Sequence, residues 1–184
     1  MKYRIPLLGI SLALGLQAQE TALLEPESFA HHIEFFNEME PEGVVNLISN
    51  EEAWSWLKPR IPYFESSDAT IEEMYYYRWW ALRKHLKVVD DYYVYTEFIE
   101  FWTKASFISP DRTICSSVRH HCRETRWLRD QSYDDSYLTY WLYGNEGGPQ
   151  DHFHQYSSWL INSLWKRTLV TGDMEFLKEH FDTL

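Results

Sequence analysis

The sequence predicts an all-α protein of antiparallel helical hairpins, with one short extended segment near residues 92–98. Apolar residues recur at three- and four-residue steps through most of the chain, as on the buried face of a helix. The breaks between these patterns are short and contain glycine or proline. Only Tyr92–Phe98 is rich in the Tyr, Val and Thr that strands prefer. The residues alone fit a bundle, a solenoid or a closed α/α toroid.

The N-terminus has the layout of a secretory signal peptide. Basic Lys2 and Arg4 precede an apolar run, Ile5–Leu16, and Ala18 follows as a small residue before a cleavage point. We therefore expect a signal peptide at 1–18, a mature domain at 19–184, and export to the periplasm, the cell surface or the medium. The apolar run is shorter than the roughly 20 residues that a spanning helix needs, so no membrane span is predicted.

Helical patterns dominate the first half of the mature chain. The first runs over Glu27–Met39, before Pro41, and a shorter one over Asn50–Leu57, before Pro59. Residues 60–68 contain Pro62 and form an extended connector. Thr70–Leu86 predicts a long amphipathic helix, and its expected buried stripe is Met74, Tyr77, Ala81, Leu82 and His85.

Four further helical patterns fill the second half, over 116–129, 133–142, 155–170 and 173–184. Gly172 is suited to end one helix, and Asp173 to cap the next. The last pattern has an apolar stripe of Phe176, Leu177, Phe181 and Leu184. We expect this stripe to need a partner helix, so the sequence is interpreted as a truncated protein or a fragment.

Charge and aromatic content narrow the class of ligand. Seventeen Lys and Arg stand against 28 Asp and Glu, a net charge of −11, which repels nucleic acid and anionic lipid. Aromatic residues make up 17% of the chain. Flat aromatic faces beside hydrogen-bonding groups suit sugar rings, although a large helical core also uses them.

Several local strings together carry a family resemblance. They are Tyr75-Tyr76-Tyr77-Arg78-Trp79-Trp80-Ala81-Leu82-Arg83-Lys84-His85, Tyr95-Thr96-Glu97-Phe98, Glu124-Thr125-Arg126-Trp127-Leu128-Arg129-Asp130, Tyr156-Ser157-Ser158-Trp159-Leu160 and Thr171-Gly172-Asp173. Over about residues 55–184 the chain resembles the six-hairpin glycosidases, the α/α-toroid clan with mannosylglycerate-hydrolase-like, trehalase-like and processing-glucosidase-like enzymes. The resemblance implies an exported glycoside hydrolase that cleaves glycosidic bonds of oligo- or polysaccharides.

The length departs from this clan. Its members need six helical hairpins, whereas 184 residues supply two or three. The resemblance therefore implies an incomplete (α/α)6 toroid, the N-terminal part of such an enzyme. It also implies that the second catalytic carboxylate comes from later hairpins, so this chain is expected to lack half of the catalytic pair.

Two carboxylates are the catalytic candidates, because glycoside hydrolysis uses one acid and one base or nucleophile. Asp130 follows Trp127 at the end of a predicted helix, where helical toroids place their pocket loops; its alternative role is to cap the next helix. Glu97 lies in an apolar, strand-like setting that raises a carboxyl pKa. Its alternative is a structural ion pair with Arg78 or Arg83.

Aromatic and polar residues near these carboxylates are the substrate-binding candidates: Arg78, Trp79, Arg126, Trp127, Asp151 and Trp159. Asp151 is also suited to cap the following helix. We expect neither a metal nor a cofactor. His120-His121 and His152-Phe153-His154 lack the spacing of a helical zinc motif, and the sequence has no glycine-rich phosphate loop. The rival function is a non-catalytic helical domain that binds carbohydrate or a protein partner.

Overall fold

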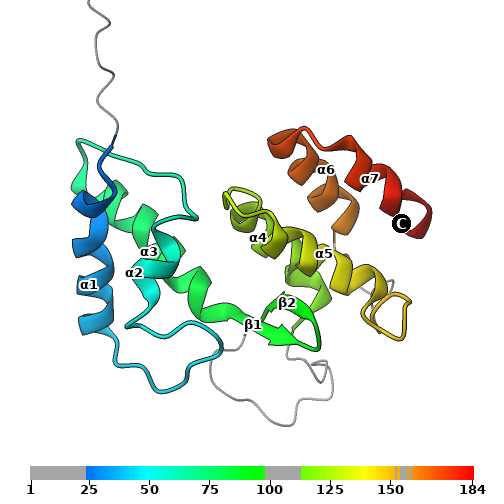
Figure 1. The fold of residues 1–184 in the computed structure, drawn as a ribbon, viewed down its shortest axis with the longest axis horizontal. Coiled ribbons are helices and arrows are strands. Elements are labelled where there is room, and N and C mark those ends of the chain that lie inside the picture. The colour runs from blue at the N-terminus through cyan, green and yellow to red at the C-terminus, as the bar shows by residue number, and fades with distance from the viewer. Residues whose placement is uncertain (1–23, 98–112, 152, 154–156, 158) are drawn as a thin grey trace, which may run out of the picture.

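The computed structural model describes residues 24–97, 113–151, 153, 157 and 159–184. The expected signal peptide at 1–18 lies outside the described residues. Helices dominate and pair as hairpins, with one two-stranded sheet between an N-terminal and a C-terminal group of helices (Figure 1). This confirms the predicted fold class, an all-α array of helical hairpins with a short extended segment. Among the described residues, no helix is long and apolar enough to cross a membrane.

The N-terminal group packs helix α1 (Ala30–Met39) against helix α3 (Ala69–His85). A 3-10 turn, Pro26–Phe29, precedes α1, and the short helix α2 (Ala53–Leu57) packs on α3. Phe36 of α1 is buried and its ring centroid lies 5.7 Å from that of Trp80 on α3. Burial of such aromatic side chains is a large favourable contribution to folding.

Helix α3 starts at a capping residue, because the Asp68 carboxylate accepts hydrogen bonds from the backbone N–H groups of Thr70 and Ile71. Its predicted buried stripe is partly wrong: the side chains of Met74 and Tyr77 are 61% and 42% exposed. The buried face instead carries Tyr76, Trp79, Trp80, Leu82, Arg83 and Lys84. Aromatic residues of α3 point to several sides of the helix, so the spacing of apolar residues alone did not predict which side α1 and α2 cover.

Arg83 is a charged residue of this core, and its hydrogen bonds compensate for its burial. Its side chain is fully buried, and its guanidinium donates to the Ile48 carbonyl at 2.7 Å and to Asn50 Oδ1 at 2.6 Å. Glu42 lies 3.5 Å away as its counter-ion. The loop between α1 and α2 is thereby tied to α3.

A β-hairpin follows α3 directly. Strand β1 (Leu86–Val89) pairs antiparallel with β2 (Tyr92–Tyr95), with Leu86 opposite Tyr95. Asp90 takes a left-handed conformation, φ 50°, in the tight turn, as short hairpin loops require. Strand β2 packs against α5, where Tyr95 meets Tyr137 edge to face at 5.4 Å. The expected extended segment is therefore confirmed over its first four residues.

The C-terminal group contains α4 (Val118–Thr125), after the 3-10 turn Cys115–Ser117, then α5 (Ser132–Tyr143), α6 (Leu160–Thr171) and α7 (Met174–His180), with a final 3-10 turn at Phe181–Thr183. Cys115 and Cys122 are both buried. Gly172 adopts φ 73° after α6, and the Asp173 carboxylate accepts from the backbone N–H groups of Glu175 and Phe176. Both predicted helix-end roles are confirmed.

The apolar stripe of the last helix is less exposed than the sequence suggested. Phe176, Leu177 and Leu184 pack against the core, and only Phe181 of the four is largely exposed, at 68%. Within the C-terminal group, several exposed apolar side chains lie on α6 and its N-terminal flank: Trp159, Ile161, Trp165 and Leu169.

Candidate carbohydrate site

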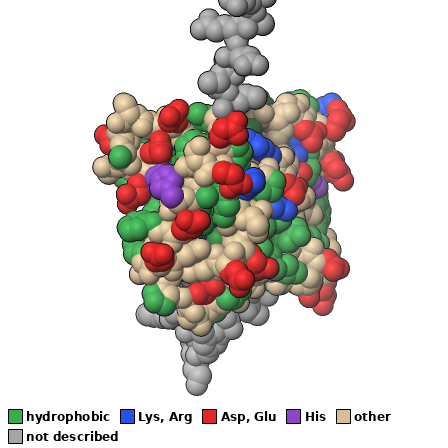
Figure 2. Space-filling model, turned by 60° about the vertical axis from the view of Figure 1, so that its left-hand side comes forward, with side chains coloured by type: hydrophobic (Ala, Val, Ile, Leu, Met, Phe, Trp, Pro, Cys, Tyr) green, Lys and Arg blue, Asp and Glu red, His purple; other side chains and the backbone are tan. Residues whose placement is uncertain are grey.

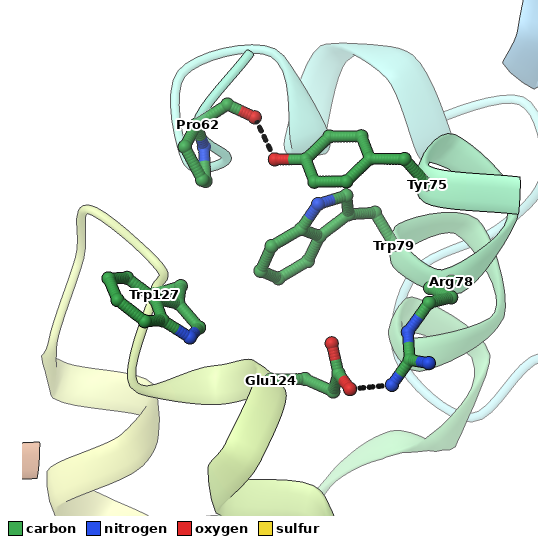
Figure 3. A pocket seen from close by; sticks show the side chains of 6 residues that line it. All are labelled: Pro62, Tyr75, Arg78, Trp79, Glu124 and Trp127. Carbon is green, nitrogen blue, oxygen red and sulfur yellow. Dashed lines mark hydrogen bonds and ion pairs between the residues drawn. The ribbon is translucent and has the colours of Figure 1, made fainter. Parts of the chain in front are cut away.

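A pocket of about 240 Å³ opens between α3, the connector before it, and the end of α4 with its following turn. Pro62, Tyr75, Arg78, Trp79, Glu124 and Trp127 line it (Figure 3). Segments far apart in sequence thus meet here. The pocket combines aromatic walls with one cation and one carboxylate.

Two tryptophans lie on opposite sides of the pocket. Trp79 is fixed on α3: its side chain is only 4% exposed, and its ring meets that of Tyr75 edge to face at 6.2 Å. Trp127 stands in the turn after α4 and is 48% exposed. In Figure 3 their rings border the same open space. The exposed face of Trp127 is suited to the apolar face of a sugar ring, and Trp79 supplies a buried wall behind the pocket.

The upper wall is held by a hydrogen bond between neighbouring segments. The Tyr75 hydroxyl donates to the carbonyl of Pro62 (Figure 3). Burial raises the pKa of Tyr75, so this hydroxyl stays protonated and keeps donating at any physiological pH. The extended connector at 60–68 is thereby fastened against α3, which gives the pocket a fixed edge.

The polar wall is an ion pair between Arg78 of α3 and Glu124 of α4 (Figure 3). The Arg78 side chain is 61% exposed and that of Glu124 is 25% exposed. An exposed pair adds little to stability, about 0–1 kcal/mol, so its position in the pocket matters more than its strength. Arg78 keeps spare N–H donors, and Glu124 has a second oxygen, for hydroxyl groups of a ligand.

Sequence reasoning missed Glu124. The residue belongs to the string that carried the family resemblance, and it precedes Trp127 by three positions, which places the two side chains on neighbouring parts of one helical turn. This spacing was the feature of the sequence that could have identified Glu124 as a neighbour of Trp127. Its pairing with Arg78, 46 positions earlier, depends on how α3 packs beside α4 and is not visible in the sequence.

Asp130 does not line the pocket. Its Oδ1 accepts hydrogen bonds from the Ser132 backbone N–H at 3.1 Å and from the Ser132 hydroxyl at 2.6 Å. These bonds reach Ser132, the first residue of α5, whereas Asp130 itself lies one position before the N-cap residue Gln131, which makes no side-chain capping bond. A catalytic role for Asp130 stays a prediction.

Glu97 also lies outside the residues that line the pocket. Its Oε2 accepts from the Ile114 backbone N–H at 2.9 Å, and its Oε1 is 3.6 Å from His121 Nε2. Burial raises the pKa of Glu97 and lowers that of His121 to about 3, so the imidazole is neutral. The alternative ion pair with Arg78 or Arg83 does not form, because those residues pair with Glu124 and Glu42. A catalytic role for Glu97 also stays a prediction.

Three of the six predicted binding residues, Arg78, Trp79 and Trp127, line the pocket. Arg126 lies beside it, with its guanidinium carbon 5.3 Å from the Trp127 ring centroid. Trp159 is 54% exposed and packs instead against Arg119, at 4.8 Å. Asp151 is exposed and accepts from the Asn145 side chain at 3.3 Å. The loop candidates are therefore not brought to this pocket.

In the described part of the chain, His, Cys, Asp and Glu residues form no cluster of three or more that could hold a metal ion. The pocket itself offers one carboxylate and no imidazole among its lining residues. Its guanidinium and carboxylate groups are able to form hydrogen bonds with hydroxyl groups.

The comparisons with known proteins relate this helical chain to glycoside hydrolases. Residues 110–184 match the mannosylglycerate hydrolase MGH1-like glycoside hydrolase domain. The chain is also similar to a solved structure named "Sialidase", with 38% sequence identity and a TM-score of 0.80. That match covers 87% of this chain and 14% of the other. No curated protein matches the sequence. The predicted relationship to the six-hairpin glycosidases is therefore confirmed.

Proposed function

We propose that this chain supplies a carbohydrate-binding part of an exported glycoside hydrolase, and that the pocket between Trp79 and Trp127 holds a sugar ring of an oligo- or polysaccharide. The observation that carries this proposal is the pocket itself. Two aromatic faces flank an Arg78–Glu124 pair, in a chain whose residues 110–184 match a glycoside hydrolase domain. Stacking holds the ring, and the ion pair binds its hydroxyl edge.

Hydrolysis of a glycosidic bond requires two carboxyl groups, and the residues that line this pocket supply one. Glu124 is the one carboxylate among the lining residues, and Arg78 neutralises it. We assign it first to substrate binding. Asp130 and Glu97 remain the proposed catalytic carboxylates from the sequence. The resemblance implies that the partner carboxylate belongs to later hairpins, and that the pair is spaced for an inverting mechanism.

A non-catalytic carbohydrate-binding domain is the second candidate. One observation favours it: the pocket has a single, charge-paired carboxylate, which suffices for binding and falls short of an acid–base pair. Both candidates predict saccharide binding, and they differ in whether the glycosidic bond is broken.

The test measures binding and hydrolysis together, on a panel of neutral and acidic oligosaccharides. Tryptophan fluorescence and calorimetry report binding, and new reducing ends report hydrolysis. We expect Trp127→Ala to weaken binding about tenfold or more. Trp165→Ala is the matched control, because Trp165 is similarly exposed, at 44%, but lies on α6 outside the pocket. Equal losses in both variants, or no binding by the parent chain, would refute the site.

Hydrolysis by the parent chain separates the two candidates. Turnover that Asp130→Asn or Glu97→Gln abolishes, with binding retained, would support the hydrolase and identify its acid. Binding without turnover on the whole panel would favour the binding domain. For export, the expected observation is a mature N-terminus near residue 19 in material recovered outside the cytosol; an uncleaved intracellular chain would contradict it.

A further inference from the structure

The negative charge of this protein is concentrated in one part of the sequence. Residues 24–57 contain eight glutamates and no Lys or Arg, whereas the rest of the chain has 20 Asp and Glu against 17 Lys and Arg. Most of the net charge of −11 therefore belongs to the segment that contains α1. Figure 2 brings the side of α1 forward, and acidic side chains lie among hydrophobic ones over this face.

The N-terminal group also exposes large apolar side chains. Phe35 and Met39, four residues apart on one side of α1, are 51% and 52% exposed. Met74 and Tyr77, three residues apart on α3, are 61% and 42% exposed. Clustered exposure of this kind marks an interaction surface more often than single exposed residues do. We call these four side chains the α1–α3 face.

The two helices present this face as one surface. Phe36, which is buried, contacts both Phe35 of α1 and Tyr77 of α3, with ring centroids 5.6 Å and 5.3 Å away. Glu40, directly after α1, pairs with Lys84 near the end of α3 at 2.8 Å, so the helices lie side by side up to their C-terminal ends. The exposed apolar side chains of α1 and α3 are therefore neighbours across one helix–helix seam.

Carboxylates accompany the apolar side chains on both helices. Glu34 and Glu38 are exposed on α1, and Glu73 is exposed on α3. In the described residues these three carboxylates form no ion pair. Lys84, the cation near the end of α3, is already paired with Glu40. The α1–α3 face thus combines exposed apolar area with negative charge that has no described counter-ion.

This charge selects among the occupants of an apolar face. A second copy bound by two-fold symmetry would place the same glutamates opposite these, because such an interface joins the same patch of both copies. Anionic lipid heads and nucleic acid are repelled as well. A helix with one apolar side and basic flanks matches both properties of the face, since it covers the apolar side chains and neutralises the carboxylates.

We propose that the α1–α3 face is a docking site for a basic amphipathic helix of a partner protein. Helix α1 has ten residues and is about 15 Å long, so a partner helix of about three to four turns covers the face. Its apolar residues contact the four exposed side chains, and its Lys or Arg residues pair with Glu34, Glu38 and Glu73. None of these residues lines the pocket at Trp79 and Trp127, so the inference stands apart from the carbohydrate site.

The test uses three synthetic peptides of about 14 residues, or four helical turns. The first has Leu at helical spacing and Lys elsewhere, the second has the same residues in an order that gives no apolar side, and the third has Glu in place of Lys. Calorimetry and fluorescence anisotropy measure their binding to the protein at low and at physiological salt. We expect the first peptide to bind about tenfold or more tightly than either of the others, and its affinity to fall as salt rises.

Substitutions of apolar residues assign the binding to the face. Phe35→Ala combined with Met39→Ala should weaken binding of the basic amphipathic peptide about tenfold. Ile161→Ala is the matched control, because Ile161 is similarly exposed but lies on α6. Circular dichroism spectra and melting temperatures check that each variant is folded.

Substitutions of carboxylates test the role of charge. Glu34→Gln combined with Glu38→Gln should weaken the same peptide at low salt and leave its affinity less dependent on salt. Glu179→Gln is the control, because Glu179 is an exposed carboxylate on α7. We expect the control to bind the peptide as the parent protein does.

Five results would overturn the inference. Equal binding of the two basic peptides would reduce the face to a nonspecific electrostatic surface, and equal binding of the basic and acidic amphipathic peptides would remove the role of charge. Equal losses in the face variants and their controls would place the binding elsewhere. Self-association that Phe35→Ala abolishes, measured by light scattering, would assign the face to a second copy. Binding of no peptide would reject the docking site and leave the carbohydrate site standing.

Discussion

Arg167 of α6 donates two hydrogen bonds to the carboxylate of Asp135 on α5, from Nε to Oδ1 at 2.7 Å and from Nη2 to Oδ2 at 2.9 Å. The same guanidinium donates through Nη1 to Asp173, the capping residue of α7, at 3.0 Å. One buried side chain therefore ties three consecutive helices together. Such planar, bidentate geometry is what arginine provides and lysine does not.

The first prediction concerns this link. Arg167→Met leaves both carboxylates without their cation, and we expect a loss of about 2–3 kcal/mol in the free energy of unfolding, below the 3–5 kcal/mol typical of fully buried pairs because Asp135 is 28% exposed. Lys178→Met breaks an exposed pair with Glu175 and should cost under about 0.5 kcal/mol. Urea unfolding measures both, and equal losses would contradict the argument.

The second prediction concerns Asp134, a fully buried carboxyl group on α5 that accepts a hydrogen bond from Thr125. Burial raises its pKa to about 7, and the charge of Asp135 adds to the rise. The Thr125 and Cys122 side chains and the Arg167 charge oppose it. The folded state therefore prefers the neutral acid, whereas in the unfolded chain the carboxyl group ionises near its ordinary pKa of 3.8.

Stability from Asp134 should thus be fully present below about pH 4 and fall as pH rises towards about 7. Asp134→Asn keeps a neutral group of similar shape and should flatten this part of the profile. Melting temperatures across that range, for the parent and the variant, give the comparison. Parallel profiles would show that Asp134 is not the group responsible.

The third prediction separates the two pocket tryptophans. Trp79 is 4% exposed and belongs to the core, so Trp79→Ala should cost about 3–5 kcal/mol in unfolding free energy. Trp127 is 48% exposed, and its replacement by alanine should cost about 1 kcal/mol or less. Denaturant unfolding of the two variants measures both losses in unfolding free energy. A large loss for Trp127→Ala would mean that this ring supports the turn rather than a ligand.

The fourth prediction concerns Asp130. Asp130→Ala removes the acceptor for the Ser132 backbone N–H and should destabilise the chain by about 1 kcal/mol, with saccharide binding unchanged. Asp130→Asn keeps an acceptor oxygen and should restore most of that stability. Chemical unfolding and calorimetric titration test this together. Unchanged stability in Asp130→Ala would show that the Asp130–Ser132 hydrogen bonds do not stabilise the start of α5.

Local features of the fold were determined by the sequence. Helix ends followed from residues that act on their own neighbours: Asp68 and Asp173 cap, and Gly172 ends a helix with a positive φ. The spacing of apolar residues located the hairpins, because a helix places residues three and four apart on one face. Trp79 and Trp127, two of the predicted binding residues, line the same pocket, and their role in binding sugar stays a prediction.

Tertiary packing decided what lies far apart in the chain. The sequence could not tell which side of the aromatic-rich α3 would be buried, since Met74 and Tyr76 were equally suited to packing until α1 covered one side. It could not pair Arg78 with Glu124 or place Asp130 outside the pocket. Helical periodicity acts within one element, whereas a pocket is formed by side chains from several elements whose relative positions depend on the packing of the whole core.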